Sequence, residues 1–229
     1  NQRQGGLYLI RAVLFDMDGV LFDTEEMGLR ALTQIAGELG YHVDRAFYQT
    51  TLGVPNAECE GIYRAALGQD FPYQTSMERF RAYFRAYNEQ HAMPRKPGLM
   101  ACLNGLKARG LKIALATSTV RPLVESYFRK MTDIAALFDA TVCGGEVPRG
   151  KPAPDIYLAA AAAVGCAPAE CVGVEDSFYG VQAVRASGAY SVMVPDMLPF
   201  GERFAPFVDS CLGSLHEICP LVDRLNGRP

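Results

Sequence analysis

The sequence has 229 residues, of which 49% are hydrophobic and 21% charged, and its formal net charge is −3 at pH 7. This length suits one large domain or two smaller ones, and the composition is typical of a soluble globular protein. The small negative charge gives no reason to expect a nucleic-acid or membrane partner, and no apolar run reaches the roughly 20 residues of a membrane helix. Residues 1–9 contain no long apolar segment, so we expect no signal peptide.

The cysteines and histidines further limit the kinds of catalytic or metal site that the chain can form. The seven cysteines include no C-x-x-C pair and are typical of buried thiols in a reducing compartment, so we expect a cytoplasmic protein. The three histidines, His42, His91 and His216, lie in no recognisable zinc or Ser-His-Asp motif. Carboxylates must therefore carry the chemistry.

The first predicted element is a buried strand over 12–15, an apolar run of the kind found in parallel sheets. Asp16 and Asp18 follow it directly, and Gly19 comes next, so two carboxylates leave the end of a strand in a loop that can turn. On its own this string also fits a solvated turn. Neighbouring carboxylates repel each other unless a cation or a shared proton relieves them, which favours a site for magnesium.

A block of helices without a strand is predicted between residues 25 and 93. Thr24 is expected to cap the first of these helices, and the spacing of apolar residues predicts helices over 25–39, 56–67 and 76–91. Pro94, Pro97 and Gly98 then interrupt the pattern, as at a domain boundary. We therefore expect a helical domain, 25–93, inserted into a core formed by 1–24 and 94–229.

Helices and strands alternate in the remaining chain, which predicts an α/β fold with a doubly wound parallel sheet. The predicted strands lie at 111–116, 140–143, 171–174, 190–194 and 210–212. The predicted helices lie at 99–109, 121–131, 155–164 and 178–187, and a last one includes Leu215 and Val222. Pro220 is expected to kink or break that last helix.

Polar residues follow several of these strands. Thr117 and the pair Glu175-Asp176 come directly after strands, so they should meet the first two aspartates at the carboxyl edge of the sheet. Lys151, in G-K-P-A-P just before a helix, can reach the same edge, although a single lysine is otherwise typical of the surface. The two acids at 175 and 176 also fit the start of a helix.

These four motifs, in this order, resemble those of the haloacid dehalogenase superfamily of phosphohydrolases, within the branch of β-phosphoglucomutase and phosphoglycolate phosphatase. The resemblance extends from about Ala12 to Val194. It implies a Rossmann-like core under a small helical cap, with hinge motion near Thr24 and near Pro94. It also implies a magnesium-dependent phosphatase.

The resemblance implies a role for each matching residue at the reacting phosphate. Asp16 is expected to be the nucleophile that passes through an aspartyl phosphate, and Asp18 to act first as acid and then as base. Lys151 is expected to neutralise the phosphoryl charge and to keep Asp16 ionised. The Thr117 hydroxyl and a backbone amide at Ser118 are expected to bind phosphoryl oxygens.

The resemblance also implies the metal ligands. Magnesium is expected to be bound by Asp16, by the backbone carbonyl of Asp18 and by Asp176. Glu175 is expected beside them, either as a ligand or as a residue that orients one.

Substrate choice is expected to depend on the cap. The stretch from Leu52 to Pro55 resembles a cap loop of the family, which makes Gly53 and Asn56 candidates for binding the substrate. Glu146 either borders the substrate or is a solvated loop acid. We expect a monomer that acts on a small phosphorylated metabolite, favouring a sugar or polyol phosphate.

The alternatives differ in reaction or in class. A β-phosphoglucomutase-type mutase fits residues 146–151, but those enzymes carry a histidine at the position of Gly28 and an arginine at that of Asn56, which lowers this alternative. A non-enzymatic phosphoacceptor domain would be about half as long and would lack the helical insertion. A binding protein without catalysis is disfavoured because the acidic and lysine motifs are all present.

Overall fold

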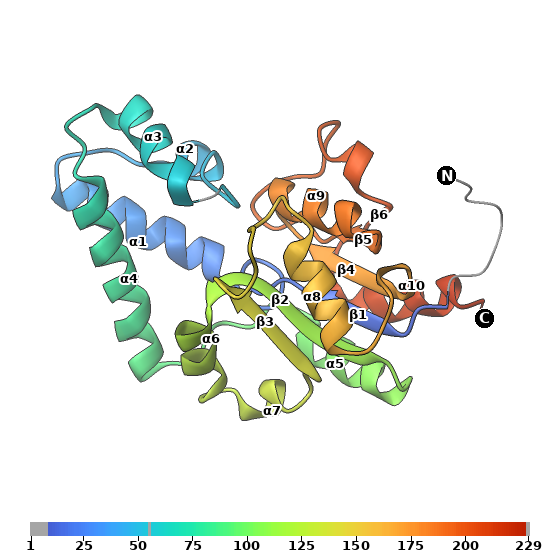
Figure 1. The fold of residues 1–229 in the computed structure, drawn as a ribbon. Coiled ribbons are helices and arrows are strands. Elements are labelled where there is room, and N and C mark those ends of the chain that lie inside the picture. The colour runs from blue at the N-terminus through green and yellow to red at the C-terminus, as the bar shows by residue number, and fades with distance from the viewer. Residues whose placement is uncertain (1–8, 55, 228–229) are drawn as a thin grey trace.

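Six parallel strands form one sheet in the order β3-β2-β1-β4-β5-β6 (Figure 1). The structure is a computed structural model and describes residues 9–54 and 56–227. The strands are β1 (Ala12–Phe15), β2 (Lys112–Val120), β3 (Ala140–Gly144), β4 (Cys171–Glu175), β5 (Tyr190–Met193) and β6 (Ser210–Cys211). The strand order reverses beside the central β1, so its carboxyl end lies at the switch point where open α/β sheets bind ligands. The predicted doubly wound α/β fold is confirmed.

The central strand shows how the core is divided between two layers of helices. Val13 and Phe15 belong to the cluster on one face, and Ala12 and Leu14 to the cluster on the other, as the alternation of a strand requires. The first face is covered by α5 (Leu99–Ala108), α6 (Arg121–Phe128), α7 (Thr132–Ala135) and α10 (Ile218–Leu225). The second is covered by α8 (Asp155–Ala163) and α9 (Phe178–Ser187).

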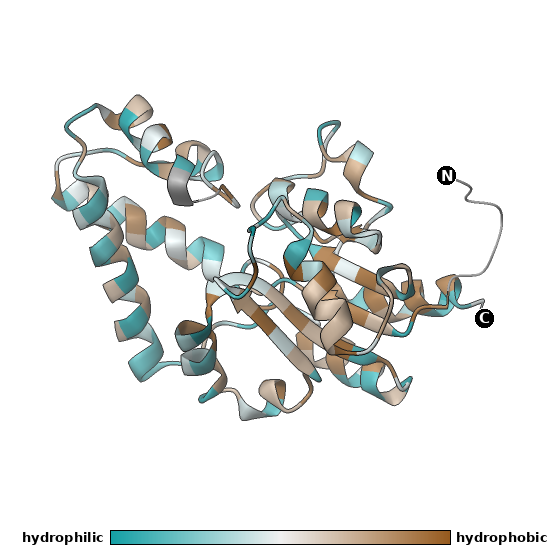
Figure 2. Cartoon of the chain, in the orientation of Figure 1, coloured by the Kyte–Doolittle hydropathy of each residue, from teal (hydrophilic) through white to brown (hydrophobic). Residues whose placement is uncertain are grey.

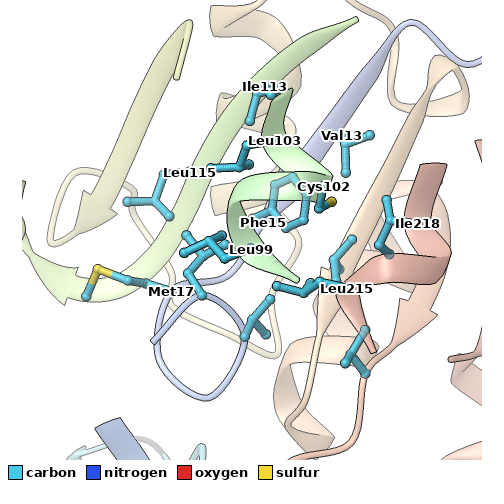
Figure 3. Packing of buried hydrophobic residues seen from close by; sticks show 14 of the residues in the cluster. Val13, Phe15, Met17, Leu99, Cys102, Leu103, Ile113, Leu115, Leu215 and Ile218 are labelled. Atoms are coloured by element: carbon cyan, nitrogen blue, oxygen red, sulfur yellow. The ribbon is translucent and has the colours of Figure 1, made fainter. Parts of the chain in front are cut away.

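Close packing on the first face anchors the strand that carries the two aspartates. Phe15 lies among side chains of α5 and of the C-terminal segment in Figure 3, and it is fully buried. Each large apolar side chain buried in this way contributes roughly 1.5–3 kcal/mol. Figure 2 shows hydrophobic residues concentrated in the strands.

Four consecutive helices lie outside the sheet: α1 (Thr24–Glu38), α2 (Arg45–Gln49), α3 (Asn56–Leu67) and α4 (Tyr73–Gln90) (Figure 1). They share a hydrophobic cluster of their own that includes Leu32, Tyr63 and Phe71. The rings of Tyr63 and Phe71 stack with centroids 5.5 Å apart. These helices therefore have a core that is mostly their own, to which Met197 from outside them contributes, while Met27 of α1 and Phe84 of α4 belong to the first cluster on the sheet. We call the four helices the cap.

The two connections between cap and sheet run side by side. The Asp23 amide donates to the Pro94 carbonyl at 2.8 Å, and the Lys96 amide donates to the Leu21 carbonyl at 2.9 Å. Hinge motion at these connections stays a prediction. Within the described ranges, no helix combines the length and the apolarity that crossing a bilayer requires.

Two local expectations need correction. β2 extends to Val120, beyond its predicted end, and its register with β3 shifts between Ala116 and Val120, so Thr117 lies in an irregular part of the strand. The last helix begins only at Ile218, after the 3-10 turn η3 (Leu215–Glu217). Pro220 therefore lies in a first helical turn, where a missing N–H costs no hydrogen bond. Two further 3-10 turns are η1 (Pro168–Glu170) and η2 (Ala205–Phe207).

Candidate active site

Asp16 and Asp18 lie where the chain leaves β1, and Gly19 lets it turn there. Gly19 has a φ of 74°, and a Cβ at this position would overlap the carboxylate of Asp176. Asp16 and Asp176 are both buried. The absence of a side chain at Gly19 thus allows carboxylates from two strands to approach each other.

Two hydroxyl groups hold the carboxylate of Asp18. Its Oδ1 accepts a hydrogen bond from Thr24 Oγ1 at 2.7 Å, and its Oδ2 accepts one from Thr119 Oγ1 at 2.7 Å. Burial raises the pKa of Asp18, and the two hydrogen bonds act in the opposite direction. The acid is thus oriented from both sides.

Thr24 is therefore not the helix cap that the sequence suggests. It is the first residue of α1, the N-cap position is Asp23, and Asp23 makes no side-chain capping bond. The Thr24 hydroxyl donates to the Asp18 carboxyl group and lies inside the helix, so it is not placed to accept a hydrogen bond from a backbone amide as a cap would.

Lys151 links the carboxylates of two strands. Its Nζ donates to Asp16 Oδ1 at 2.6 Å and to Glu175 Oε1 at 2.5 Å. Burial raises the pKa of Asp16 to about 7, although the charge of Lys151 lowers it. Burial by itself would lower the pKa of Lys151, but the two carboxylates outweigh it and raise that pKa. The lysine therefore stays charged beside them.

Glu175 is fully buried and serves as an anchor beneath this pair. Its Oε1 also accepts from Tyr157 Oη at 2.7 Å, and its Oε2 accepts from Ser177 Oγ at 3.1 Å. A Cβ at Gly180, in the first turn of α9, would overlap the Glu175 carboxylate. The sequence therefore leaves a space in α9 that this carboxylate fills.

The donor set fits a hard divalent cation. Oxygen atoms of Asp16, Glu175 and Asp176 all lie within 4.8 Å of one another. Burial raises the pKa of Asp176 well above its ordinary value, and the charges of Glu175 and Asp16 raise it further. Such a cluster is relieved when a cation with oxygen ligands binds.

An orphaned oxygen beside the cluster supports the same fit. Asp196 Oδ2 is buried and has no hydrogen-bond partner within the described chain, whereas its Oδ1 accepts from Lys96 Nζ at 2.6 Å. A Cβ at Gly19 would lie 3.3 Å from Asp196 Oδ2 and would overlap Asp176 Oδ2, so both carboxylates face this turn. A buried carboxylate oxygen without a donor is costly, and a hydrated cation would supply one.

A cavity of about 350 Å³ lies between the cap and the edge of the sheet. It brings together most of the residues that the sequence singled out: Asp16, Asp18, Gly53, Thr117, Ser118, Lys151 and Asp176. Thr117 is itself fully buried, and its Oγ1 accepts from the Thr119 amide at 3.1 Å. The arrangement can bind one small molecule between a charged floor and a cap wall.

Of the predicted site residues whose side chains the structure describes, Glu175 and Glu146 do not line the cavity. Glu146 accepts hydrogen bonds from the Arg121 guanidinium and from the Cys143 amide, the latter at 2.9 Å, so its carboxylate fixes a loop. Asn56 begins α3, but its side chain lies outside what the structure describes, as does Pro55 of the same cap loop.

Sequence reasoning missed four residues that the structure brings to the site. Thr119 and Asp196 each follow a strand core, so the rule that found Thr117 could have found them. Glu25 and Tyr48 line the cavity from the cap, and Tyr48 Oη donates to Glu25 Oε2 at 2.9 Å. No motif marks these two, because they meet only through the packing of α1 against α2.

The parallel sheet, the acidic centre with its lysine at the switch point, and the helical cap above it define a capped α/β enzyme. A family model for haloacid dehalogenase-like hydrolases matches residues 10–188, and the chain belongs to this family. The resemblance drawn from the sequence is confirmed. The chain is accordingly a phosphoric monoester hydrolase, since phosphatases are prominent among its relatives.

Individual relatives are similar over most of the chain. A phosphorylated carbohydrates phosphatase from Thermotoga maritima is 33% identical over 184 residues, which cover 78% of this chain and 82% of that protein. Beta-phosphoglucomutase from Bacillus subtilis is 30% identical over 193 residues, with 81% and 83% covered. The crystal structure of CbbY from Rhodobacter sphaeroides in complex with phosphate has a TM-score of 0.75 and 28% identity, covering 91% of this chain and 96% of that one.

One relative is much longer. The chloroplastic protein SUPPRESSOR OF QUENCHING 1 from Arabidopsis thaliana is 34% identical over 194 residues, and these cover 82% of this chain but only 18% of that protein.

Proposed function

We propose that this protein is a magnesium-dependent phosphatase that hydrolyses a small phosphorylated metabolite through an aspartyl phosphate on Asp16. The observation that carries the proposal is the position of Asp16 at the floor of the cavity, with Lys151 at 2.6 Å and Asp18 beside it. This combination supplies a nucleophile, a charge to balance the phosphoryl oxygens and a second carboxyl group for proton transfer.

The proposed reaction has two displacement steps at phosphorus. In the first, a carboxylate oxygen of Asp16 bonds to phosphorus, the bond to the leaving oxygen breaks, and Asp18 gives its proton to that oxygen. In the second, Asp18 takes a proton from a water molecule whose oxygen attacks phosphorus, and inorganic phosphate leaves Asp16. Burial raises the pKa of Asp18, which is the direction that an acid for the first step requires.

The remaining floor residues would bind the transferred group. Lys151 would face a phosphoryl oxygen while holding Asp16, and the Thr117 hydroxyl and the Ser118 amide would donate to two others. Magnesium would be held by Asp16, Asp176 and the backbone carbonyl of Asp18, with Glu175 next to them. When bound, the cation neutralises charge on the phosphoryl oxygens.

Names of relatives support a sugar or polyol phosphate as the substrate, because they include a phosphorylated carbohydrates phosphatase and a hexitol phosphatase. A phosphoglucomutase-type reaction is the second candidate, favoured by similarity to beta-phosphoglucomutase. It would require the cap to hold a second phosphate, and the position expected to carry a histidine is Gly28, where a Cβ would overlap Tyr48 Oη. We therefore favour the phosphatase.

We also propose that the protein acts in the cytoplasm as a monomer. Six of its cysteines are buried, and all seven are free thiols, which supports a reducing compartment.

The deciding experiment is incubation with magnesium and a panel of phosphorylated metabolites that includes β-glucose 1-phosphate, followed by phosphorus NMR. Net release of inorganic phosphate, absent from the Asp16→Asn variant, is the expected result. Conversion of β-glucose 1-phosphate to the 6-phosphate with little release would instead identify a mutase.

A further inference from the structure

Among the described residues of the cap wall, Glu25 carries the one carboxyl group. Glu25 lies in the first turn of α1, and its Oε2 accepts the hydrogen bond from Tyr48 Oη at 2.9 Å. Its Oε1 makes no hydrogen bond within the described chain, yet it is not an enclosed atom, since the side chain lines the cavity. One carboxyl oxygen on the cap is thus available for a hydrogen bond to a ligand that enters from solvent.

Gly28 is what permits this arrangement. It lies one turn after Glu25 on α1, and a Cβ at position 28 would overlap Tyr48 Oη and would come 3.3 Å from the ring of Phe80. The Tyr48 hydroxyl therefore occupies the space that a side chain at 28 would need. Because Tyr48 is only 6% exposed, it cannot move aside without disturbing the cap core.

The cap wall offers no cation to a second anionic group. Among the described lining residues, Lys151 is the one lysine or arginine, and it already contacts two carboxylates of the floor. The remaining cap residues of the wall are mostly apolar or aromatic: Leu52, Val54, Tyr63, Tyr73, Met77 and Phe80. A carboxylate or a second phosphate on the leaving group would lose its hydration here without gaining a charged partner.

Cationic side chains line a neighbouring cavity of about 480 Å³. It lies between α4 and α6, it also contacts Glu25 and Tyr48, and Arg81 and Arg85 line it. Both arginines are exposed at the surface of α4. Replacing these two arginines therefore tests whether an anionic leaving group binds in the neighbouring cavity.

From this geometry we propose that Glu25 and Tyr48 recognise the leaving group, and that the enzyme selects phosphate monoesters whose remainder is uncharged and carries a hydroxyl group. The proposal rests on the proposed function and refines it. A hydroxyl group on the leaving group would hydrogen-bond Glu25 Oε1, and the aromatic wall would cover the carbon skeleton. Monoesters with a carboxylate or a second phosphate would be rejected.

The test compares substrates that differ in one group. Sorbitol 6-phosphate and 6-phosphogluconate differ at one end, where a hydroxymethyl group replaces a carboxylate, and glycerol 3-phosphate and 3-phosphoglycerate form a shorter pair of the same kind. We expect kcat/KM for at least one polyol phosphate to exceed that of its carboxylate counterpart by about tenfold or more. Equal values, or a preference for the carboxylates, would overturn the proposal.

Variants assign the preference to particular residues. Glu25→Ala and Tyr48→Phe should raise KM for the polyol phosphate about tenfold while changing kcat little, and should raise KM for p-nitrophenyl phosphate, which has no hydroxyl group, by a clearly smaller factor. Glu26→Ala is the matched control, because the Glu26 carboxylate faces Arg45 and Arg30 and does not line the cavity. An equal loss with the polyol phosphate and with p-nitrophenyl phosphate would mean that Glu25 and Tyr48 only support the fold, and would overturn the proposal.

A binding measurement separates this proposal from the proposed function. In the Asp16→Asn variant, calorimetry with magnesium measures the affinity for each member of a pair without turnover. A preference for the polyol phosphate supports the proposal even if wild-type turnover is absent. Equal affinities within each pair that turn into a preference for the polyol phosphate in Arg81→Ala/Arg85→Ala would show that the neighbouring cavity binds anionic leaving groups, and would overturn the proposal.

Discussion

At the scale of single residues, the site is a set of carboxyl groups held in unusual states by burial. Asp16 and Asp18 at the floor and Glu25 in the cap all have raised pKa values, with burial as the leading cause. Lys151 is the counter-charge for the floor, and no cationic side chain among the described residues forms an ion pair with Glu25. Replacing Glu25 and replacing Lys151 should therefore change the stability of the protein in different ways, and both changes can be measured.

The raised pKa of Glu25 predicts that the stability difference between wild type and a Glu25→Gln variant depends on pH. Burial raises its pKa from 4.5 to about 8, so its contribution to stability is complete below about pH 4.5 and is lost as the pH rises through about 8. Glu25→Gln removes this ionisation. In thermal melts the variant should therefore gain stability relative to wild type between about pH 5 and about pH 8.5, by several degrees.

The neighbouring acid provides the comparison. Arg45 lowers the pKa of Glu26, so Glu26→Gln should show no gain at high pH. A rise of the same size in both variants would contradict the assignment to Glu25.

Lys151 predicts a large loss of stability when it is replaced. Lys151→Met leaves Asp16 and Glu175 without their cation in a buried site, and breaking such a cluster costs about 3–5 kcal/mol. Urea unfolding at about pH 8 should show this loss, with a smaller one at about pH 5, where Asp16 takes up a proton. Lys107→Met is the control, since the ion pair of Lys107 with Asp139 is partly exposed and should contribute at most about 1 kcal/mol.

At the scale of elements, the site depends on how closely strand ends and helix starts approach. α9 begins directly after Glu175-Asp176, and Gly180 in its first turn leaves room for the Glu175 carboxylate. In the same way α1 starts beside Asp18 because Thr24 bonds to that carboxylate instead of capping the helix. The positions at which α1 and α9 begin therefore depend on contacts with site residues as well as on helix propensity.

Two glycine variants test this view of α9. Gly180→Ala should destabilise the protein by more than about 1 kcal/mol and reduce activity, because its Cβ would displace the anchor of Lys151. Gly61→Ala, in α3, has nothing within 4 Å of the added Cβ and should stabilise by roughly 0.5–1 kcal/mol through helix propensity. Denaturant midpoints of the two variants should move in opposite directions, and a shared direction would contradict the packing argument.

At the scale of the whole molecule, cap and sheet meet over a cavity whose floor is acidic, so cation binding and folding should be linked. Magnesium that binds only the folded protein stabilises it, by about 2.7 kcal/mol at a magnesium concentration of about a hundred times Kd. The melting temperature should therefore rise. The rise should be larger at about pH 8 than at about pH 5.5, because protons compete for Asp16 and Asp176.

The variant Asp176→Asn should lose most of this rise, while Asp70→Asn, at an exposed position, should keep it. Differential scanning calorimetry with and without magnesium makes the comparison. An equal rise in both variants would show that the cation binds elsewhere.

Much of the fold and of the floor could be predicted from the sequence. The strand cores and Asp16, Thr117 and Asp176 follow from one local pattern, an apolar run ended by a polar residue. The carboxyl ends of parallel strands meet at one edge, so a local motif there already fixes an approximate position in space.

The sequence by itself therefore determined the α/β class, the family resemblance and the floor of the site. Only the tertiary structure decided that Thr119, 101 positions away, holds Asp18, and that Glu25 and Tyr48 form the cap wall. The reason is physical: a residue at a strand end is positioned by the sheet, whereas a residue on a cap helix is positioned by side-chain packing between helices, which no short stretch of sequence encodes.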